Sequence, residues 1–215
     1  MKLIVFGATG DVGRHVVAEA LSRNHTVTAV ARSKDRLDAL PGEMRREVGD
    51  LLIDTDIARR LMTGHDAAIG ALRPSVGSEF DLVGLTRALL TGAAETALPV
   101  FVTGGAATLK LADASGHTVL TAPGFLPDTV RPIAEACAAQ DALLETEKNA
   151  AWTCLRPPAM LLQGPRTGNY ARGTDTLVTD ADGNSQISYA DFAVAMLDLA
   201  ETQDAHHERL TVGWA

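Results

Sequence analysis

A glycine-rich turn close to the N-terminus constrains the fold more than any other feature of the sequence. Residues 2–17 read KLIVFGATGDVGRHVV, a predicted strand, three glycines in G-x-x-G-x-x-G spacing, and the start of an amphipathic helix. The first glycine permits a tight turn, the second lets a pyrophosphate approach the backbone, and the third allows close packing of helix on strand. Free N–H groups at the helix start favour phosphate. The segment predicts a dinucleotide site at these residues: Gly7, Thr9, Gly10, Asp11, Val12 and Gly13.

Short apolar runs alternate with helical patterns along the rest of the first two thirds of the chain. Strands are expected at 3–6, 27–31, 46–48, 67–69, 100–102 and 152–155, and helices at 12–22, 34–40, 55–62, 80–95 and 128–148. Strands without polar alternation are typical of a parallel sheet covered on both faces. The pattern predicts an α/β Rossmann fold, a doubly wound parallel sheet with helices on both faces.

The last third has a different composition. Residues 163–185 are rich in Gly, Thr, Asn and Asp, and they precede an expected strand at 186–189, a helix at 191–200 and a closing strand at 209–214. We expect residues 160–215 to form a small C-terminal cap on the carboxyl edge of the sheet. The whole chain, 1–215, is then a single NAD(P)-binding domain.

The end of the second expected strand indicates which nicotinamide cofactor is preferred. An acidic residue binds the ribose 2′-hydroxyl of NAD at this position, whereas here the strand ends in Arg32 and Ser33. A charge-assisted contact from Arg32 to a 2′-phosphate is worth about 1.5–3 kcal/mol. NADP(H) is therefore the preferred prediction; NAD(H) remains possible if Arg32 stacks on the adenine or faces solvent.

Two further segments are expected to contact the cofactor. Asp50 and Leu51 follow the third strand, where Asp50 either accepts the adenine amino group or begins the next helical turn. Gly70, Ala71 and Leu72 end the fourth strand, where small residues would leave room for the nicotinamide ribose.

Composition excludes several classes of partner. A formal net charge of -8 argues against nucleic acid, because phosphate binding needs a basic stripe. No apolar run approaches the ~18 residues of a membrane span, and the first strand is too short for a secretory segment, so we expect a cytoplasmic protein. Cys137 and Cys154 have no metal-ligand spacing and are expected to be small core residues; no metal site is predicted. A monomer or a small homo-oligomer is expected.

Several motifs resemble one family along essentially the whole chain. They are GATGDVG (7–13), VARS (30–33), FVTGGA (101–106) and LRPP (155–158), followed by GPRTGNY (164–170), DGNSQISYADFA (182–193) and TVG (211–213). The first four resemble atypical short-chain dehydrogenases/reductases with NmrA-like, NAD(P)H-binding sequences. The last three resemble bacterial proteins named NADH-flavin reductases, a group similar to biliverdin reductase B.

The resemblance also defines what is missing. Typical members of the superfamily use a Tyr-x-x-x-Lys pair on the helix after the fifth strand and a nearby serine for proton exchange. Here the tyrosines are Tyr170 and Tyr189, neither of which lies between residues 102 and 152. Thr103 replaces the serine, but the proton relay is absent, so ordinary carbonyl–alcohol chemistry is not expected.

The resemblance implies further site residues at the strand ends. Thr103, Gly104 and Pro157 are expected at the cofactor, and Arg73, Gly105, Phe125 and Pro158 in the substrate pocket. Thr103 and His117 are the catalytic candidates. His117 and Asp113 lie in the loop 112–125, where they either orient or protonate a substrate or serve ordinary loop roles.

Three functional hypotheses follow. The first is an NADPH-dependent reductase of flavin, quinone or a bilin-like planar acceptor, by direct hydride transfer, with FMN or FAD as an exchangeable substrate. The second is a non-catalytic NADP(H)-sensing regulator of the NmrA-like type, which loop 112–125 plugging the pocket would favour. The third, a sugar-nucleotide epimerase, conflicts with the missing Tyr–Lys pair.

Overall fold

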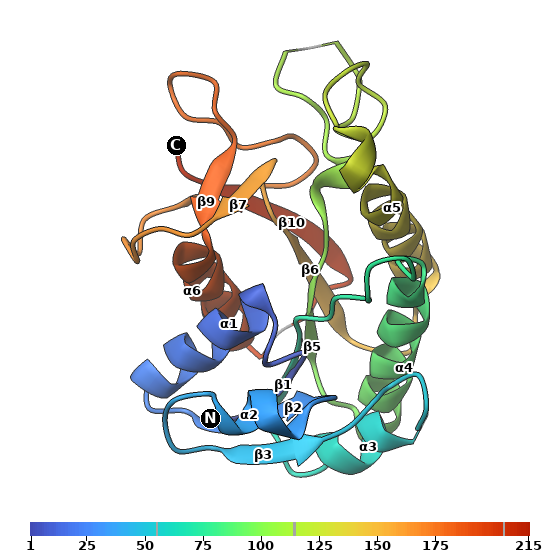
Figure 1. Cartoon of the computed structure of the whole chain (residues 1–215), viewed down its shortest axis with the longest axis vertical. Helices are drawn as coiled ribbons and strands as arrows, with labels where there is room; N and C mark the ends of the chain where they lie inside the picture. The colour runs from blue at the N-terminus through green and yellow to red at the C-terminus, as the bar shows by residue number, and fades with distance from the viewer. Residues whose placement is uncertain (55, 114, 204) are drawn as a thin grey trace.

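The computed structural model describes every residue except 55, 114 and 204, and its main feature is one eight-stranded sheet (Figure 1). The strand order is β3-β2-β1-β4-β5-β6-β10-β8, and each neighbouring pair is parallel except β10 and β8. The strands are β1 (Lys2–Phe6), β2 (Thr26–Ala31), β3 (Arg45–Val48), β4 (Ala67–Gly70), β5 (Val100–Thr103), β6 (Trp152–Arg156), β8 (Ala171–Gly173) and β10 (Glu208–Gly213). The first six strands have the order of a Rossmann fold, which confirms the predicted fold class.

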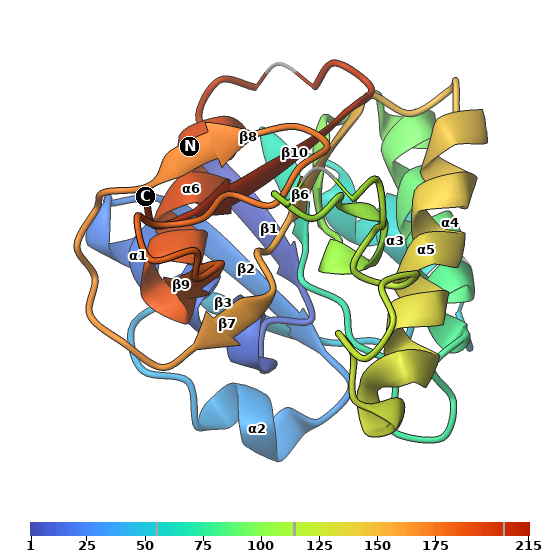
Figure 2. The ribbon, with the colours of Figure 1, turned by 90° about the horizontal axis from the view of Figure 1, so that it is seen from above.

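Helices cover both faces of the sheet (Figure 2). They are α1 (Asp11–Ser22), α2 (Lys34–Asp38), α3 (Ile57–Met62), α4 (Asp81–Thr96), α5 (Arg131–Thr146) and α6 (Tyr189–Ala200), with short 3-10 turns η1 (Ala106–Thr108) and η2 (Asp128–Val130). Most bounds lie within a few residues of those expected. The expected helix 128–148 begins instead as η2, and Thr55, the expected first residue of the helix 55–62, lies outside the described residues.

Strand β1 shows why both faces need cover. Leu3 and Val5 belong to the apolar cluster that contains α1 and α6, whereas Ile4 and Phe6 belong to the cluster that contains α3 and α4. Successive side chains of a strand point to opposite faces, so a strand apolar at every position requires a helix layer on each side.

The C-terminal region is a smaller cap than the one expected. Strand β10 pairs with β6 and extends the main sheet, and α6 packs against α1 on one face of it. Helix α6 is almost fully apolar and buried, so it needs a sheet face to cover it. The part that stands apart from the main sheet is the pair β7 (Met160–Leu162) and β9 (Gln186–Ser188).

Ion pairs reinforce the packing of α1 on α6. Arg23 donates to Glu19 on its own helix and to Asp198 on α6, each at 2.8 Å. Arg166, in the segment between β7 and β8, also donates to both carboxylate oxygens of Glu19. The hydrogen bonds from Arg166 hold the pKa of the buried Glu19 below its ordinary value.

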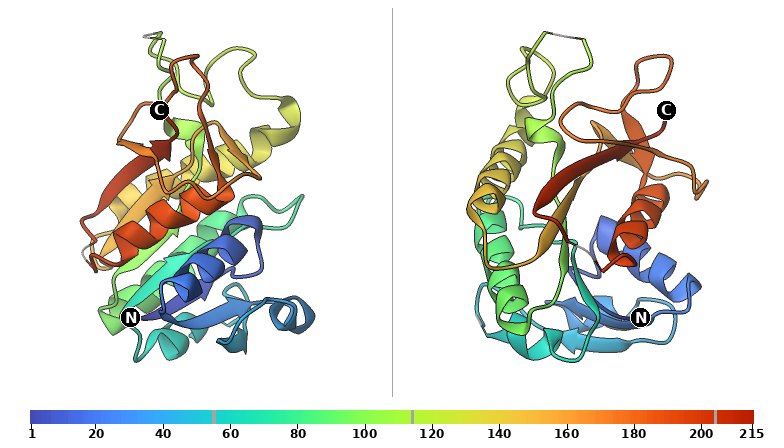
Figure 3. Two further views of the ribbon diagram at one scale, coloured as in Figure 1. Left: turned by 90° about the vertical axis from the view of Figure 1, so that its left-hand side faces the viewer. Right: turned by 180° about the vertical axis from the view of Figure 1, so that it is seen from behind.

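The two chain ends lie at opposite edges of the sheet (Figure 3). The N-terminus precedes β1 at the amino edge, and the C-terminus follows β10, which is parallel to β6, at the carboxyl edge. The loops after β1, β2, β4, β5 and β6 therefore all meet at the carboxyl edge. None of the helices in the described ranges has the length and apolar character that crossing a bilayer requires.

Candidate functional site

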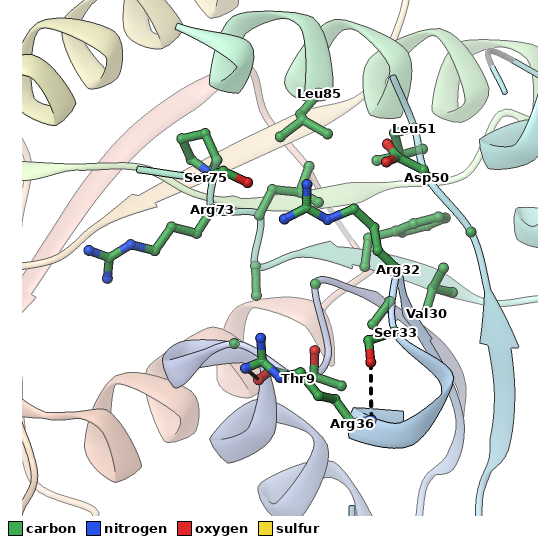
Figure 4. A pocket seen from close by; sticks show the side chains of 18 of the residues that line it. Thr9, Val30, Arg32, Ser33, Arg36, Asp50, Leu51, Arg73, Ser75 and Leu85 are labelled. Carbon is green, nitrogen blue, oxygen red and sulfur yellow. Dashed lines mark hydrogen bonds between the residues drawn. The ribbon is translucent and has the colours of Figure 1, made fainter. Parts of the chain in front are cut away.

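A cavity of about 590 Å³ opens at the carboxyl edge of the sheet, above β1, β2 and β4 (Figure 4). The strand order reverses between β1 and β4, which is where open α/β sheets bind ligands. Its volume falls within the range of small-molecule sites. The lining residues are Phe6, Gly7, Thr9, Gly10, Asp11, Val30, Ala31, Arg32, Ser33, Arg36, Gly49, Asp50, Leu51, Ala71, Leu72, Arg73, Pro74, Ser75, Val76 and Leu85.

The glycine-rich turn lies against the neighbouring strand end with no space for side chains. Gly7 has a φ of 77°, and a Cβ there would lie 2.2 Å from the carbonyl oxygen of Ala71. A Cβ on Gly13 would lie 2.1 Å from the Gly7 carbonyl oxygen. Gly7 therefore permits the turn and Gly13 the close contact of α1, in the roles expected from the sequence.

The start of α1 faces the cavity. Gly10 caps the helix without a side-chain hydrogen bond, so free backbone N–H groups remain at the end where the helix dipole is positive. Asp11 offsets part of this charge, but it pairs with Arg14 at 3.1 Å and with Arg73 at 3.9 Å. Val12 is half-buried and packs on the core rather than lining the cavity.

Arg32 extends across the cavity from the end of β2 (Figure 4). No hydrogen bond or ion pair connects its exposed guanidinium to any part of the chain that the structure describes. Ser33 caps α2 by accepting from the Arg36 amide, and the Arg36 guanidinium donates to the Thr9 carbonyl oxygen at 2.7 Å. Two guanidiniums thus line the cavity that the glycine-rich turn also lines, and that of Arg32 has no partner among the described residues.

Asp50 and Leu51 line the side of the cavity away from Thr9 and Arg36 (Figure 4). The Asp50 carboxylate accepts a hydrogen bond from the Leu52 amide at 2.9 Å, and its carbonyl accepts from Ile53 and Asp54. Asp50 therefore forms the expected turn, and it also lines the cavity. The two interpretations are compatible, because the other carboxylate oxygen has no hydrogen bond to the described residues.

The glycine at the end of β4 has a different role from the one expected. Ala71 and Leu72 line the cavity, but a Cβ on Gly70 would lie 2.5 Å from the Leu89 side chain of α4. The small size of Gly70 thus serves the packing of α4 on the sheet, which the sequence did not indicate, and room for the nicotinamide ribose at this strand end stays a prediction.

The expected residues after β5 and β6 lie along the same sheet edge but outside this cavity. Thr103 ends β5, and its buried hydroxyl has no partner among the described residues. Gly104 packs against Cys154 and Arg156, Gly105 packs against Cys137, and Pro157 and Pro158 follow β6. Their assignment to the cofactor and substrate stays a prediction.

The loop 112–125 is not brought to the cavity. His117 is exposed, and its backbone amide donates to Ser115, whose own amide donates to Asp113. The hydrogen bond from the Ser115 amide lowers the pKa of Asp113. Phe125 is also exposed, and none of the described residues of the loop lines the cavity. The role of His117 or Asp113 toward a substrate stays a prediction.

The cysteines have the packing role expected of them. Cys154 is fully buried in β6, and Cys137 is half-buried on α5, where burial raises its pKa to about 11. In the part of the chain that the structure describes, no group of three His, Cys, Asp or Glu side chains could hold a metal ion.

The sequence analysis missed several residues of the cavity. Arg36, Ser75 and Val76 all line it, as do Leu85 and Gly49. Arg36 had a signal, since it is the third cation within five residues after β2. The segment after Arg73 had no such signal in the sequence, because the path of the loop before α4 decides whether this segment lies at the cavity.

The chain has the strand order of a Rossmann fold, a glycine-rich turn after β1, and a cavity where the strand order reverses. These features define a Rossmann-type dinucleotide-binding protein. The chain belongs to the NAD(P)H-binding family, whose sequence model matches residues 7–203. It is 32% identical over 217 residues to the uncharacterized protein YwnB of Bacillus subtilis (strain 168), covering 99% of this chain and 98% of YwnB.

Solved structures with the same fold carry different names. A candidate NADH-flavin reductase, SP1627 from Streptococcus pneumoniae TIGR4, is 31% identical with a TM-score of 0.88, and 100% of each chain is covered. A candidate epimerase from Bacteroides thetaiotaomicron is 30% identical with a TM-score of 0.88, covering 99% of this chain and 96% of the other. The resemblance predicted from the motifs is confirmed at the level of the family.

Proposed function

We propose that this protein is an NADPH-dependent reductase of a planar conjugated acceptor such as a flavin, a quinone or a bilin-like compound. One observation carries the cofactor preference. The unpaired Arg32 guanidinium extends over the cavity beside the glycine-rich turn, where an NAD-specific site would have a carboxylate. A 2′-phosphate would give this guanidinium a partner, with about 1.5–3 kcal/mol of preference over a hydroxyl.

The residues present fit a nicotinamide dinucleotide. Gly7, Gly10 and the free amides of α1 would hold the pyrophosphate, and Asp50 and Leu51 would lie at the adenine. The buried, unpaired Thr103 hydroxyl at the end of β5 would find a partner in the cofactor or the acceptor. When bound, the reduced nicotinamide supplies a hydride.

The side chains near β5 support an acceptor that takes its proton from water. Helix α5 has the sequence RPIAEACAAQDALLET, with neither tyrosine nor lysine. The Tyr170 hydroxyl donates to Asp198, and the Tyr189 ring stacks on His15 with centroids 5.5 Å apart. A flavin or quinone needs no protein acid for hydride transfer, so the chain contributes chiefly positioning of the acceptor. The name of the pneumococcal relative agrees with this chemistry, and we expect flavin to bind and leave as a substrate.

The test compares NADPH and NADH as reductants of FMN in the wild type, Arg32→Asp and Lys34→Asp. Both variants change the charge equally, but Lys34 is exposed and pairs with Asp38, so it serves as the matched control. We expect NADPH to be preferred by 10- to 100-fold in the wild type and in Lys34→Asp, and the preference to disappear in Arg32→Asp.

The other outcomes distinguish the remaining hypotheses. Tight NADPH binding without reduction of FMN or of a quinone would favour the NADP(H)-sensing regulator over the reductase. None of the described residues of loop 112–125 lines the cofactor cavity, so this part of the loop does not block NADPH there. Equal use of NADH and NADPH by the wild type would refute the assigned role of Arg32.

A further inference from the structure

A buried ionic cluster lies behind the carboxyl ends of β5 and β6. Arg156 is 1% exposed and Asp141 is 2% exposed, and Thr108 lies between them. Arg156 Nη1 donates to the Thr108 hydroxyl at 3.1 Å, and this hydroxyl donates to Asp141 Oδ2. Nη1 also lies 3.7 Å from Asp141 Oδ2. A buried ion pair of this kind costs desolvation energy and is weak evidence for stability, so its position in the fold needs another explanation.

The same arginine reaches two other segments at this edge of the sheet. Its Nη2 donates to the carbonyl of Thr174 at 2.5 Å and to the carbonyl of Arg209 at 3.4 Å. The backbone of Lys110, two residues after η1, also bonds to the segment after β8: its amide donates to the Asp175 carbonyl, and its carbonyl accepts from the Leu177 amide. Arg156 thus ties the turn η1 to the segment after β8 and to β10.

One face of α5 holds the segment 103–108 at three successive points. Gln140 Nε2 donates to the Thr103 carbonyl at 3.5 Å, and a Cβ on Gly105 would lie 2.4 Å from Cys137 Sγ. Asp141 accepts from Thr108. Residues 137, 140 and 141 have the i, i+3, i+4 spacing of one helix face. Hydrogen-bonding capacity remains on this face, since Thr103 Oγ1, Gln140 Oε1 and Asp141 Oδ1 are buried without partners among the described residues.

We propose that Asp141 and Thr108 are positioning residues for acceptor binding: anchored by Arg156, they hold the end of β5 at residues 103–105 in the conformation that receives the acceptor. This inference rests on the proposed reductase function. Asp141 acts through Thr108, which lies three residues beyond Gly105, so a shift of η1 moves the strand end directly. The cavity that would hold the adenosine half lies at β1, β2 and β4, away from the cluster.

The test uses Thr108→Val, which removes the hydroxyl while keeping the side chain's shape, with Thr108→Ser as the conservative rescue. Thr146→Val, at the last residue of α5, is the matched control because, among the described residues, the Thr146 hydroxyl bonds to the Leu143 carbonyl of its own helix. For each protein we would measure kcat and KM for FMN with NADPH, the Kd for NADPH, and hydrogen exchange of residues 103–110. We expect Thr108→Val to raise KM for FMN at least tenfold and to speed exchange in this segment alone. The Kd for NADPH stays within twofold, and Thr108→Ser and Thr146→Val resemble the wild type.

Two results would overturn the inference. One is an unchanged KM and unchanged exchange in Thr108→Val; the other is a parallel loss of FMN turnover, NADPH binding and exchange protection along the whole chain, which indicates a general structural role. If Thr108→Val does not fold, Asp141→Asn, which keeps the shape and an acceptor oxygen, is held to the same criteria. If the wild type reduces no acceptor, the proposed function fails, and exchange of residues 103–110 alone then decides whether Thr108 positions the strand end.

Discussion

The Arg36 guanidinium and the Thr9 carbonyl oxygen are joined by a 2.7 Å hydrogen bond between residues 27 positions apart in the chain. This contact ties α2 to the glycine-rich turn on the side of the cavity where Arg32 is unpaired (Figure 4). The second strand and its helix therefore contribute to the proposed phosphate site in two ways, through the charge of Arg32 and through the position of the turn.

Replacing Arg36 with alanine should weaken NADPH binding by about 3- to 10-fold, because the turn loses an anchor and the cavity loses a positive charge. Calorimetric titration with NADPH measures the effect. Lysine at this position restores the charge but lacks the planar fork of guanidinium, so we expect it to recover binding only in part. Arg45→Ala, at an exposed pair with Glu47 on β3, is the control. An unchanged NADPH affinity in Arg36→Ala would contradict this role.

Gly7→Ala should unfold the turn or abolish cofactor binding, whereas Gly64→Ala should only lower stability modestly. Both glycines have positive φ, so both alanines carry backbone strain of about 1–2 kcal/mol. Gly64 has nothing within 4 Å of its Cβ position, while Gly7 would place a Cβ 2.2 Å from a backbone oxygen. Thermal unfolding and NADPH titration of both variants separate the effect of backbone strain from the effect of the steric clash with Ala71. Equal losses in the two variants would show that the close approach to Ala71 does not matter.

Glu19→Gln should reduce the free energy of unfolding by about 2 kcal/mol at neutral pH. The side chain is 5% exposed and accepts from Arg23 and Arg166, and the latter contact is the main cause of its lowered pKa. A carboxylate with a lowered folded-state pKa stabilises the fold above its ordinary pKa of 4.5, and this contribution disappears as the pH falls through the folded value. The stability difference between variant and wild type should therefore shrink toward acid pH. Urea unfolding at several pH values tests this, and a difference independent of pH would refute it.

Asp38→Asn provides the reference for that measurement. Asp38 pairs with Lys34 on an exposed face of α2, so the loss should stay within about 0.5 kcal/mol at every pH.

Thiol reagents should label the native protein very slowly. Burial raises the pKa of Cys137 to about 11, so about one thousandth of this thiol is ionised at pH 8, and burial also raises the pKa of Cys154. We expect labelling of both thiols to accelerate sharply in urea. Rapid reaction of one thiol in the native state, lost in Cys137→Ser, would show that α5 opens at this position.

The fold class and the part of the site that depends on local pattern could both be predicted from the amino-acid sequence. The glycine spacing between strand and helix predicted the turn at Gly7 and the packing of Gly13, and the apolar runs predicted six strands of a parallel sheet, which the structure places in Rossmann order. Arg32 could also be predicted as a cofactor contact, because it directly follows the residues of β2 in the sequence. These features depend on local backbone conformation and on the spacing of apolar residues. Both can be read from a short stretch of sequence.

The features that join distant segments could not be predicted from local sequence and became visible in the folded chain. The contact of Arg36 with Thr9, the packing of Gly70 against Leu89, the entry of β10 into the main sheet and the Asp141–Thr108–Arg156 cluster each connect residues far apart in the chain. A glycine at a strand end has the same local pattern whether a ligand or a helix fills the space beside it. Which of these fills the space depends on how the layers pack, and the packing is set by burial and shape across the whole sheet.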